Sequence, residues 1–224
     1  MMTVRQRQQL SQSQEDYLKA LYELGARARG PVGTNELSER LGVSAPSAAQ
    51  MLARLADLGL VRHDRYRGAA LTDAGSAVAL EMVRHHRLLE MYLAQALGYR
   101  WDEVHDEAER LEHVISERME QRIYDALGRP GLDPHGDPIP GPAGELAAAP
   151  GRPLHECESG ETVRVVRVSD RDPGKLRELS RLGLTLGATV ELVRESRYEG
   201  PLSVRIDGRR RQVALGVARA VFVS

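Results

Sequence analysis

The sequence lacks several features that would define a class of protein. Its 224 residues include a single cysteine, Cys157, which excludes an internal disulfide framework and a multi-cysteine zinc site and fits a reducing cytoplasm. No apolar run approaches the roughly 18 residues expected of a membrane-spanning helix, and the polar N-terminal residues 1–14 contain no apolar signal segment. We therefore expect a cytoplasmic protein without a membrane partner.

An excess of charge of one sign is missing too. The 31 Lys and Arg residues balance 32 Asp and Glu residues, which gives a net charge of -1. A nucleic-acid interface would therefore have to come from a local basic patch. With 42% hydrophobic and 28% charged residues, the composition is that of a folded globular protein. The length allows two modest domains with separate cores.

The segment 82–113 carries most of the residues that can ligate a metal. His86 and Glu90 are spaced i, i+4 on one expected helix. A second expected helix places four more candidate ligands within about a quarter to a third of its circumference: His105, Glu109, Glu112 and His113. Imidazoles and carboxylates without thiolates suit a divalent first-row metal and argue against structural zinc. The alternative is that these side chains are solvated on exposed helix faces.

The first third of the chain predicts a winged helix-turn-helix. A helix over residues 11–25 precedes a short helix that Thr34 caps and the left-handed Gly42 ends. A further helix follows from Ser44 to Gly59, and two short strands over 60–65 and 69–72 form a small wing. This layout is typical of DNA-binding domains.

The exposed start of the helix that begins at Ser44, together with the wing, supplies a local polar and basic patch. The overall charge of the chain does not provide one. Short polar groups on that helix can contact base edges or phosphates, and arginines of the wing suit phosphate or minor-groove contacts. The candidate DNA-binding residues are Ser44, Pro46, Ser47, Gln50, Arg54, Arg62, Arg65 and Arg67. The alternative is a helix-turn-helix that serves protein contacts, with solvated arginines.

Two long helices are expected next, over residues 73–97 and 102–127, separated by Gly98 and stopped by Gly128 and Pro130. They carry more apolar surface than a winged helix can cover, which predicts a dimer interface. A two-fold dimer would present two recognition helices about one duplex turn apart.

The last third of the chain predicts a small barrel behind a connection rich in Pro, Gly and Ala over residues 129–152. One helix is expected over 173–182, and Arg209 to Arg211 are expected at a solvated hairpin tip rather than in a second DNA site. The expected β runs are 162–168, 189–195, 202–206, 211–215 and 218–223.

The predicted fold class is a mainly α N-terminal winged helix-turn-helix with a helical dimerisation domain, joined to a small all-β SH3-like domain. The DNA-binding domain is expected to span residues 1–72. The helical metal-binding and dimerisation domain follows over 73–140, a linker over 141–153 and the SH3-like domain over 154–224.

Local strings of the sequence now point to a family. In order, EDYL, SAPSAAQMLARL, VRHHRLLE, VHDEAERLEH and DPHGDPIP resemble the DtxR/MntR family of metal-dependent transcriptional regulators. The resemblance covers nearly the whole chain and implies a C-terminal SH3-like domain of the kind also seen in FeoA. It further implies a homodimer that binds a palindromic double-stranded DNA operator, with a divalent metal as corepressor and no small-molecule substrate.

The resemblance also implies which residues bind metal. The primary site of the family falls on Asp16, Glu109, Glu112 and His113, joined by His86 in manganese-type members. The ancillary site falls on His86, Glu90 and His105, with Asp172 and, less well, Lys175 at the matching C-terminal positions. Lys19 stands where manganese-type members place another carboxylate, which favours separated metals over a closely bridged pair.

Hard carboxylates at Asp16 and Glu109, where iron-type members place Met and Cys, favour Mn²⁺ as the metal. Fe²⁺ is the alternative, and Zn²⁺, Co²⁺ or Cd²⁺ would bind in vitro. The sequence thus predicts a repressor of manganese or iron homeostasis and not an enzyme. Two other readings compete with it. One is a di-iron enzyme, which would need Glu and Glu-x-x-His motifs from four helices, and the other is a winged-helix regulator that responds to an organic ligand.

Overall fold

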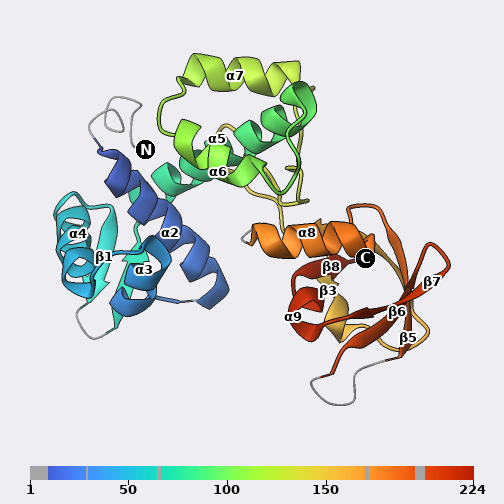
Figure 1. The fold of residues 1–224 in the computed structure, drawn as a ribbon. Coiled ribbons are helices and arrows are strands. Elements are labelled where there is room, and N and C mark those ends of the chain that lie inside the picture. The colour runs from blue at the N-terminus through green and yellow to red at the C-terminus, as the bar shows by residue number, and fades with distance from the viewer. Residues whose placement is uncertain (1–9, 29, 65–66, 170–171, 195–199) are drawn as a thin grey trace. The chain divides into compact units, whose positions relative to one another are not determined.

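The computed structural model describes residues 10–28, 30–64, 67–169, 172–194 and 200–224. The chain divides into two compact units, which we describe separately (Figure 1). The first comprises Met1–His85 with Pro140–Glu145, and the second His86–Ile139 with Leu146–Ser224. The long helix α5 (Asp73–Leu97) runs through the boundary between them.

The first unit contains the expected helix-turn-helix. It comprises α2 (Gln12–Ala28), α3 (Thr34–Leu41) and α4 (Ala45–Asp57). Gly42 ends α3 in the left-handed conformation with φ of 64°, and the Ser44 side chain caps α4 by accepting a hydrogen bond from the amide of Ser47. The expected cap at Thr34 is wrong, because Gly33 is the N-cap residue and Thr34 is already helical.

The wing is a two-stranded antiparallel sheet of β1 (Val61–Asp64) and β2 (Gly68–Leu71). Val32 forms an additional bridge to Ala69 on β2. Gly68 has φ of 92°, and a Cβ there would lie 2.4 Å from the carbonyl oxygen of Val32. Only glycine permits this close backbone approach. Buried apolar side chains of α2, α3, α4, the wing and the start of α5 share one core.

The helical part of the second unit differs from expectation at one place. The single helix expected over 102–127 is instead α6 (Val104–Leu111) and α7 (Glu117–Ala126). The Ser116 side chain accepts a hydrogen bond from the Met119 amide and starts a new helix. Ile115, just before it, is buried in the core that α5, α6 and α7 form together. The local cap and this buried anchor therefore turn the chain.

The C-terminal part is an all-β domain with one covering helix, α8 (Pro173–Leu182). Its strands are antiparallel in the order β3-β8-β4-β5-β6-β7. The strands are β3 (Arg152–Pro153), β4 (Thr162–Val168), β5 (Thr189–Arg194), β6 (Leu202–Ile206), β7 (Arg209–Val213) and β8 (Val221–Val223). The expected fold class is thus confirmed for each part of the chain.

Two local expectations in this domain are wrong. Asp207 and Gly208 both have positive φ, 49° and 72°, and they form the two-residue turn between β6 and β7. Arg209 to Arg211 therefore lie in β7 rather than at the hairpin tip. The short helix α9 (Leu215–Ala218) occupies the end of one expected strand and the beginning of the next.

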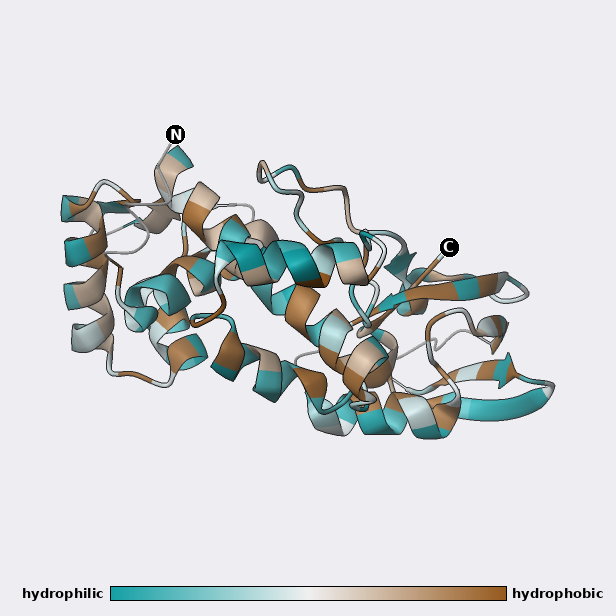
Figure 2. Ribbon diagram, turned by 90° about the horizontal axis from the view of Figure 1, so that it is seen from above, coloured by the Kyte–Doolittle hydropathy of each residue, from teal (hydrophilic) through white to brown (hydrophobic). Residues whose placement is uncertain are grey.

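Hydrophilic and hydrophobic residues alternate along the helices (Figure 2), as expected of elements with one buried face. Among the described residues, no helix has the length and apolar character needed to cross a bilayer.

Between Arg129 and Gly151 the described chain forms neither helix nor strand, but Ile139 is buried in the helical core.

Candidate metal centre and nucleic-acid interface

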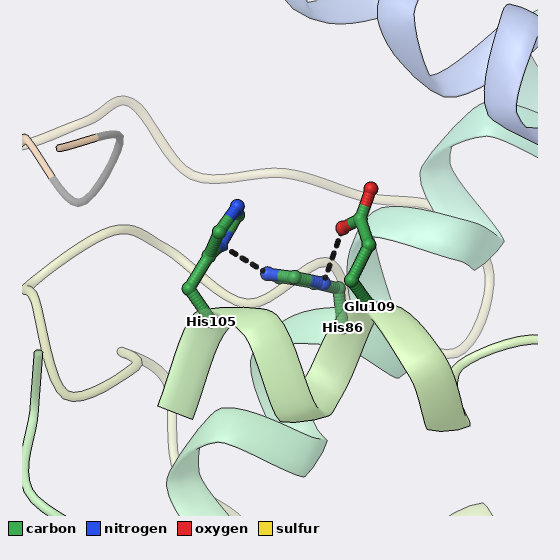
Figure 3. Close-up of side chains that lie close together, drawn as sticks. All are labelled: His86, His105 and Glu109. Atoms are coloured by element: carbon green, nitrogen blue, oxygen red, sulfur yellow. Dashed lines mark hydrogen bonds and ion pairs between the residues drawn. The ribbon is translucent and has the colours of Figure 1, made fainter. Parts of the chain in front are cut away.

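His86 on α5 lies at the centre of a cluster of imidazoles and carboxylates. Its Nε2 lies 3.0 Å from Glu90 Oε1 and 3.0 Å from His105 Nδ1. Its Nδ1 lies 2.5 Å from Glu112 Oε2 and 3.4 Å from Glu109 Oε2. Figure 3 shows the His86 ring between the side chains of His105 and Glu109. The helical spacing predicted from the sequence thus brings five of the predicted ligands together.

Burial raises the energetic cost of the negative charges in this cluster. The side chains of Glu90 and Glu112 are fully buried, and a buried carboxylate needs a compensating positive partner. Burial alone would raise the pKa of Glu90, but the charge of His86 and hydrogen bonds from His105 and His86 outweigh it and hold that pKa well below its usual range. Glu90 is therefore an anion that requires cationic neighbours.

The same carboxylate faces a second group of ligand atoms. Glu90, Asp133 and His135 are all buried, and each offers one ligand atom within 4.8 Å of the others. Burial, followed by the charges of Glu90 and Asp137, raises the pKa of Asp133 to about 7, against the opposing charges of Arg87 and His135. Sequence reasoning did not assign Asp133 and His135, although both stand in the string DPHGDPIP.

The remaining predicted ligands have different settings. His113 follows α6, with its Nε2 3.7 Å from Glu112 Oε1. Asp16 lies half-buried on α2 of the first unit, and Lys19 is buried one turn further along the same helix. That Asp16 binds the same metal as the ligands on α6 stays a prediction.

Asp172 has a structural function in the C-terminal domain. It is the N-cap of α8, and its Oδ1 accepts hydrogen bonds from the amides of Gly174 and Lys175 at 2.9 and 3.2 Å. This capping accounts for the carboxylate without a metal. Asp172 stays a predicted ligand, and Lys175 lies with its Nζ 3.9 Å from Asp172 Oδ2.

The predicted DNA-binding side chains that the structure describes are on the surface. Along α4 and its cap these are Ser44, Pro46, Ser47, Gln50 and Arg54, and on the wing they are Arg62 and Arg67. The Ser44 and Ser47 hydroxyls are hydrogen bonded to each other at 2.8 Å. Arg65 lies outside the described residues. A helix with exposed polar groups beside two wing arginines is suited to major-groove and phosphate contacts.

The cluster around His86 fits a divalent metal by its donor chemistry. The groups near His86 are imidazole nitrogens and carboxylate oxygens, and the chain's one thiol, Cys157, is buried in the C-terminal core. These donors suit Mn²⁺, Fe²⁺ and related ions. A winged helix-turn-helix with a carboxylate and histidine cluster on adjoining helices is the arrangement of a metal-responsive, DNA-binding transcriptional regulator.

Comparison with known proteins gives the family. Residues 9–69 match the N-terminal DNA-binding domain of the iron-dependent repressors, residues 72–141 match their metal-binding and dimerisation domain, and residues 152–224 match the FeoA domain. The chain belongs to the iron-dependent repressor family.

Individual relatives agree with this membership. The chain is 38% identical over 159 residues to the iron-dependent repressor IdeR of Mycobacterium leprae (strain TN), a match that covers 68% of this chain and 69% of that relative. It is 30% identical over 220 residues to the diphtheria toxin repressor of Corynebacterium glutamicum (strain ATCC 13032), covering 93% and 94% of the two chains. A solved manganese-dependent transcriptional repressor in complex with manganese superposes with a TM-score of 0.87 at 44% identity, covering 94% of this chain and 98% of that one.

Proposed function

We propose that the protein is a manganese-responsive repressor of metal homeostasis in which Mn²⁺ is the corepressor of a homodimer. The observation that carries the choice of metal is the position of Glu109, whose Oε2 lies 3.4 Å from His86 Nδ1. Together with the buried Glu112 it makes the donor set around His86 rich in hard oxygens, which Mn²⁺ prefers. The solved repressor reported above is manganese-dependent.

Iron is the second candidate metal, because the curated relatives reported above include an iron-dependent repressor. Imidazole and carboxylate donors also bind Fe²⁺, and affinity alone favours Fe²⁺ over Mn²⁺ in the divalent series. Discrimination must then come from the geometry of the site and from the supply of each metal in the cell.

The chain's own residues explain how metal binding could control DNA binding. A bound divalent cation would supply the positive charge that the buried Glu90 and Glu112 require. Asp16 lies on α2, whose apolar face packs with α3 and α4 in one core. We infer that ligation of Asp16 together with Glu112 and His113 fixes the reading helix α4 for operator binding. Such coupling is typically about 1 to 3 kcal/mol, or about 5- to 150-fold in affinity, and it is reciprocal.

The dimer also has a structural basis in the second unit. Val114, between α6 and α7, is 73% exposed, and Met119 on α7 is 48% exposed. Both stand in the segment that matches the family's dimerisation domain. Burying these side chains against a second copy would remove apolar surface from water and place two copies of α4 on a palindromic operator.

Operator binding measured by fluorescence anisotropy tests the proposed function. The full-length protein is titrated onto labelled operator DNA with a chelator, with Mn²⁺ and, without oxygen, with Fe²⁺. We expect Mn²⁺ to raise the affinity at least fivefold, within the usual coupling range. Equal affinity with chelator and with either metal would refute a metal-responsive repressor, and a response to Fe²⁺ alone would refute manganese as the corepressor.

Matched variants locate the response within the protein. Glu112→Gln and Asp16→Ala should leave a folded dimer whose weak operator binding no longer responds to Mn²⁺. Asp106→Asn changes an exposed carboxylate on the same helix as Glu109 and should respond like the unaltered protein. Retained stimulation in Asp16→Ala would contradict the participation of α2.

A further inference from the structure

The C-terminal domain is basic, although the chain as a whole is not. Residues 152–224 contain 14 Lys and Arg against 10 Asp and Glu, a net charge of +4, whereas residues 1–151 contain 17 against 22, a net charge of -5. Three of the cations of the C-terminal domain are consecutive, Arg209, Arg210 and Arg211. A local excess of positive charge attracts polyanions whatever the net charge of the whole chain.

These three arginines form most of β7, which lies at the edge of the sheet. Among the described strands, β7 pairs with β6 alone. Arg210 is directly opposite Arg205 of β6, whereas Arg209 and Arg211 are opposite the buried Ile206 and Val204. Because successive side chains of a strand point to opposite faces, β7 carries guanidinium groups on both of its faces. We call Arg209, Arg210 and Arg211 the basic edge.

The charges of the basic edge are not neutralised within the described part of the chain. Other arginines of this domain have carboxylate partners: Arg152 pairs with Glu161, Arg177 with Asp102, Arg181 with Glu178 and Arg205 with Glu191. None of the basic edge has such a partner among the described residues. Arg210 Nη2 donates to the Ser203 hydroxyl at 3.4 Å, and Arg211 Nε is buried without a hydrogen-bond partner there. Their positive charge is thus available to a further partner.

Protection of the sheet edge does not account for this arrangement. Charged side chains on an edge strand prevent its pairing with the strand of another chain, but either sign of charge serves that purpose. Here Arg210 is directly opposite Arg205, and like charges directly opposite in a strand pair are destabilising. Only Arg205 of the two is bonded to a carboxylate, that of Glu191, at 2.5 Å. A bound polyanion would relieve this repulsion, whereas edge protection alone would not require it.

We propose that the basic edge is a second DNA-contacting surface, which binds the phosphate backbone of a duplex without reading its sequence. The planar guanidinium fork matches phosphate oxygens by paired hydrogen bonds. Alternate residues of a strand are about 7 Å apart, and each DNA strand presents one charge per about 3.4 Å of helix axis, so neighbouring arginines can each reach a phosphate. Phosphate contacts carry no sequence information directly.

DNA fits this surface better than an acidic protein does. The chain belongs to a family of DNA-binding repressors, so a duplex is already a partner of the same molecule. Contacts made by the basic edge would add to those of α4 and the wing, because two weak sites on one chain gain from a high effective concentration when both can engage. Each added phosphate contact would also release counterions and steepen the dependence of affinity on salt.

The salt dependence of binding to non-operator DNA tests the proposal. The full-length protein is titrated by fluorescence anisotropy, with a chelator present, onto a labelled mixed-sequence duplex of about 30 base pairs at about 50 to 200 mM NaCl. The test variant carries Arg209→Gln and Arg210→Gln, both at exposed positions. The control carries Lys175→Gln and Arg181→Gln, which remove the same charge from exposed positions on α8. A third variant, with Arg209→Lys and Arg210→Lys, keeps the charge of the basic edge.

We expect the test variant to lower the slope of log affinity against log salt by about 1.8, or about 0.9 for each lost phosphate contact. The unaltered protein would then lose about tenfold more affinity than the test variant when salt rises from about 50 to about 200 mM. The Lys variant should keep the slope of the unaltered protein, and the control should lower it by less than half as much as the test variant.

Three results would overturn the proposal. One is an unchanged slope in the test variant, and another is an equal fall in the control, which would assign the effect to total charge. The third is binding of poly-glutamate in preference to the duplex, lost in the test variant, which would assign the basic edge to an acidic protein. Matching circular dichroism spectra establish that the variants are folded. The test uses neither operator nor metal, so failure of manganese as corepressor would leave its outcome unchanged.

Discussion

Replacing Asp133 with Asn should change how the stability of the metal-free protein depends on pH. In the folded chain, burial and the charges of Glu90 and Asp137 raise the pKa of Asp133 to about 7, while Arg87 and His135 oppose the shift. In the unfolded chain this pKa returns to about 3.9. The folded state thus holds an extra proton between these two values. The stabilising contribution of the protonated carboxyl is complete below pH of about 4 and is lost as pH rises through about 7.

The size of the effect follows from the shift. A difference of about three pKa units at about 1.4 kcal/mol per unit gives an upper limit of about 4 kcal/mol. Asn at this position retains the oxygen that accepts from the amides of His135 and Asp137 but is neutral at every pH. We therefore expect Asp133→Asn to be more stable than the unaltered protein at pH 8, by about 1 to 4 kcal/mol, and to differ little from it at pH 4.

Urea unfolding with a chelator present, followed by Trp101 fluorescence at pH 4, 6 and 8, measures this difference. Asp106→Asn, on the exposed face of α6, serves as the control and should follow the unaltered protein at each pH. The reasoning is refuted if Asp133→Asn is less stable than the unaltered protein at pH 8, or if the difference between them is the same at all three values.

Four further substitutions test other parts of the structure. Gly68→Ala would put a Cβ 2.4 Å from the Val32 carbonyl oxygen and should cost about 2 to 4 kcal/mol in urea unfolding. Gly42→Ala meets no atom within 4 Å and should cost only about 1 kcal/mol for its positive φ. Glu109→Cys adds a soft donor and should shift the order of metal affinities toward Zn²⁺ and Cd²⁺ in competition titrations; an unchanged order would contradict the argument for manganese. Arg62→Ala should lower the slope of log affinity against log salt by about one in anisotropy titrations, if Arg62 contacts a phosphate.

The parts of the fold that could be predicted from the sequence are those set by local signals. The Ser44 cap, the left-handed Gly42 and the paired strands of the wing each depend on residues a few positions apart. The break between α6 and α7 could not be predicted in the same way, because neither glycine nor proline stands in residues 112–116 and the apolar period continues through them. Its causes, the Ser116 cap and the burial of Ile115, become decisive only once the helical core has formed.

The residues of the candidate metal centre also divide into those that local spacing predicts and those that only the folded chain brings together. His86 and Glu90, one helical turn apart, and His105 and Glu109, likewise one turn apart, follow from helical spacing. Asp133 and His135 join Glu90 only because a loop without periodicity folds back onto α5. The sequence signal for them was an Asp and a His two residues apart between prolines and glycines, which by itself is common in surface turns.

Glu90 connects the two groups of ligand atoms, and this has a thermodynamic consequence. One carboxylate oxygen faces the imidazoles of His86 and His105, and the other faces His135. A cation on the His86 side would draw negative charge from this carboxylate and would also fix the torsion angles that place its other oxygen beside His135. Linkage then requires that changes at His135 alter metal binding on the His86 side.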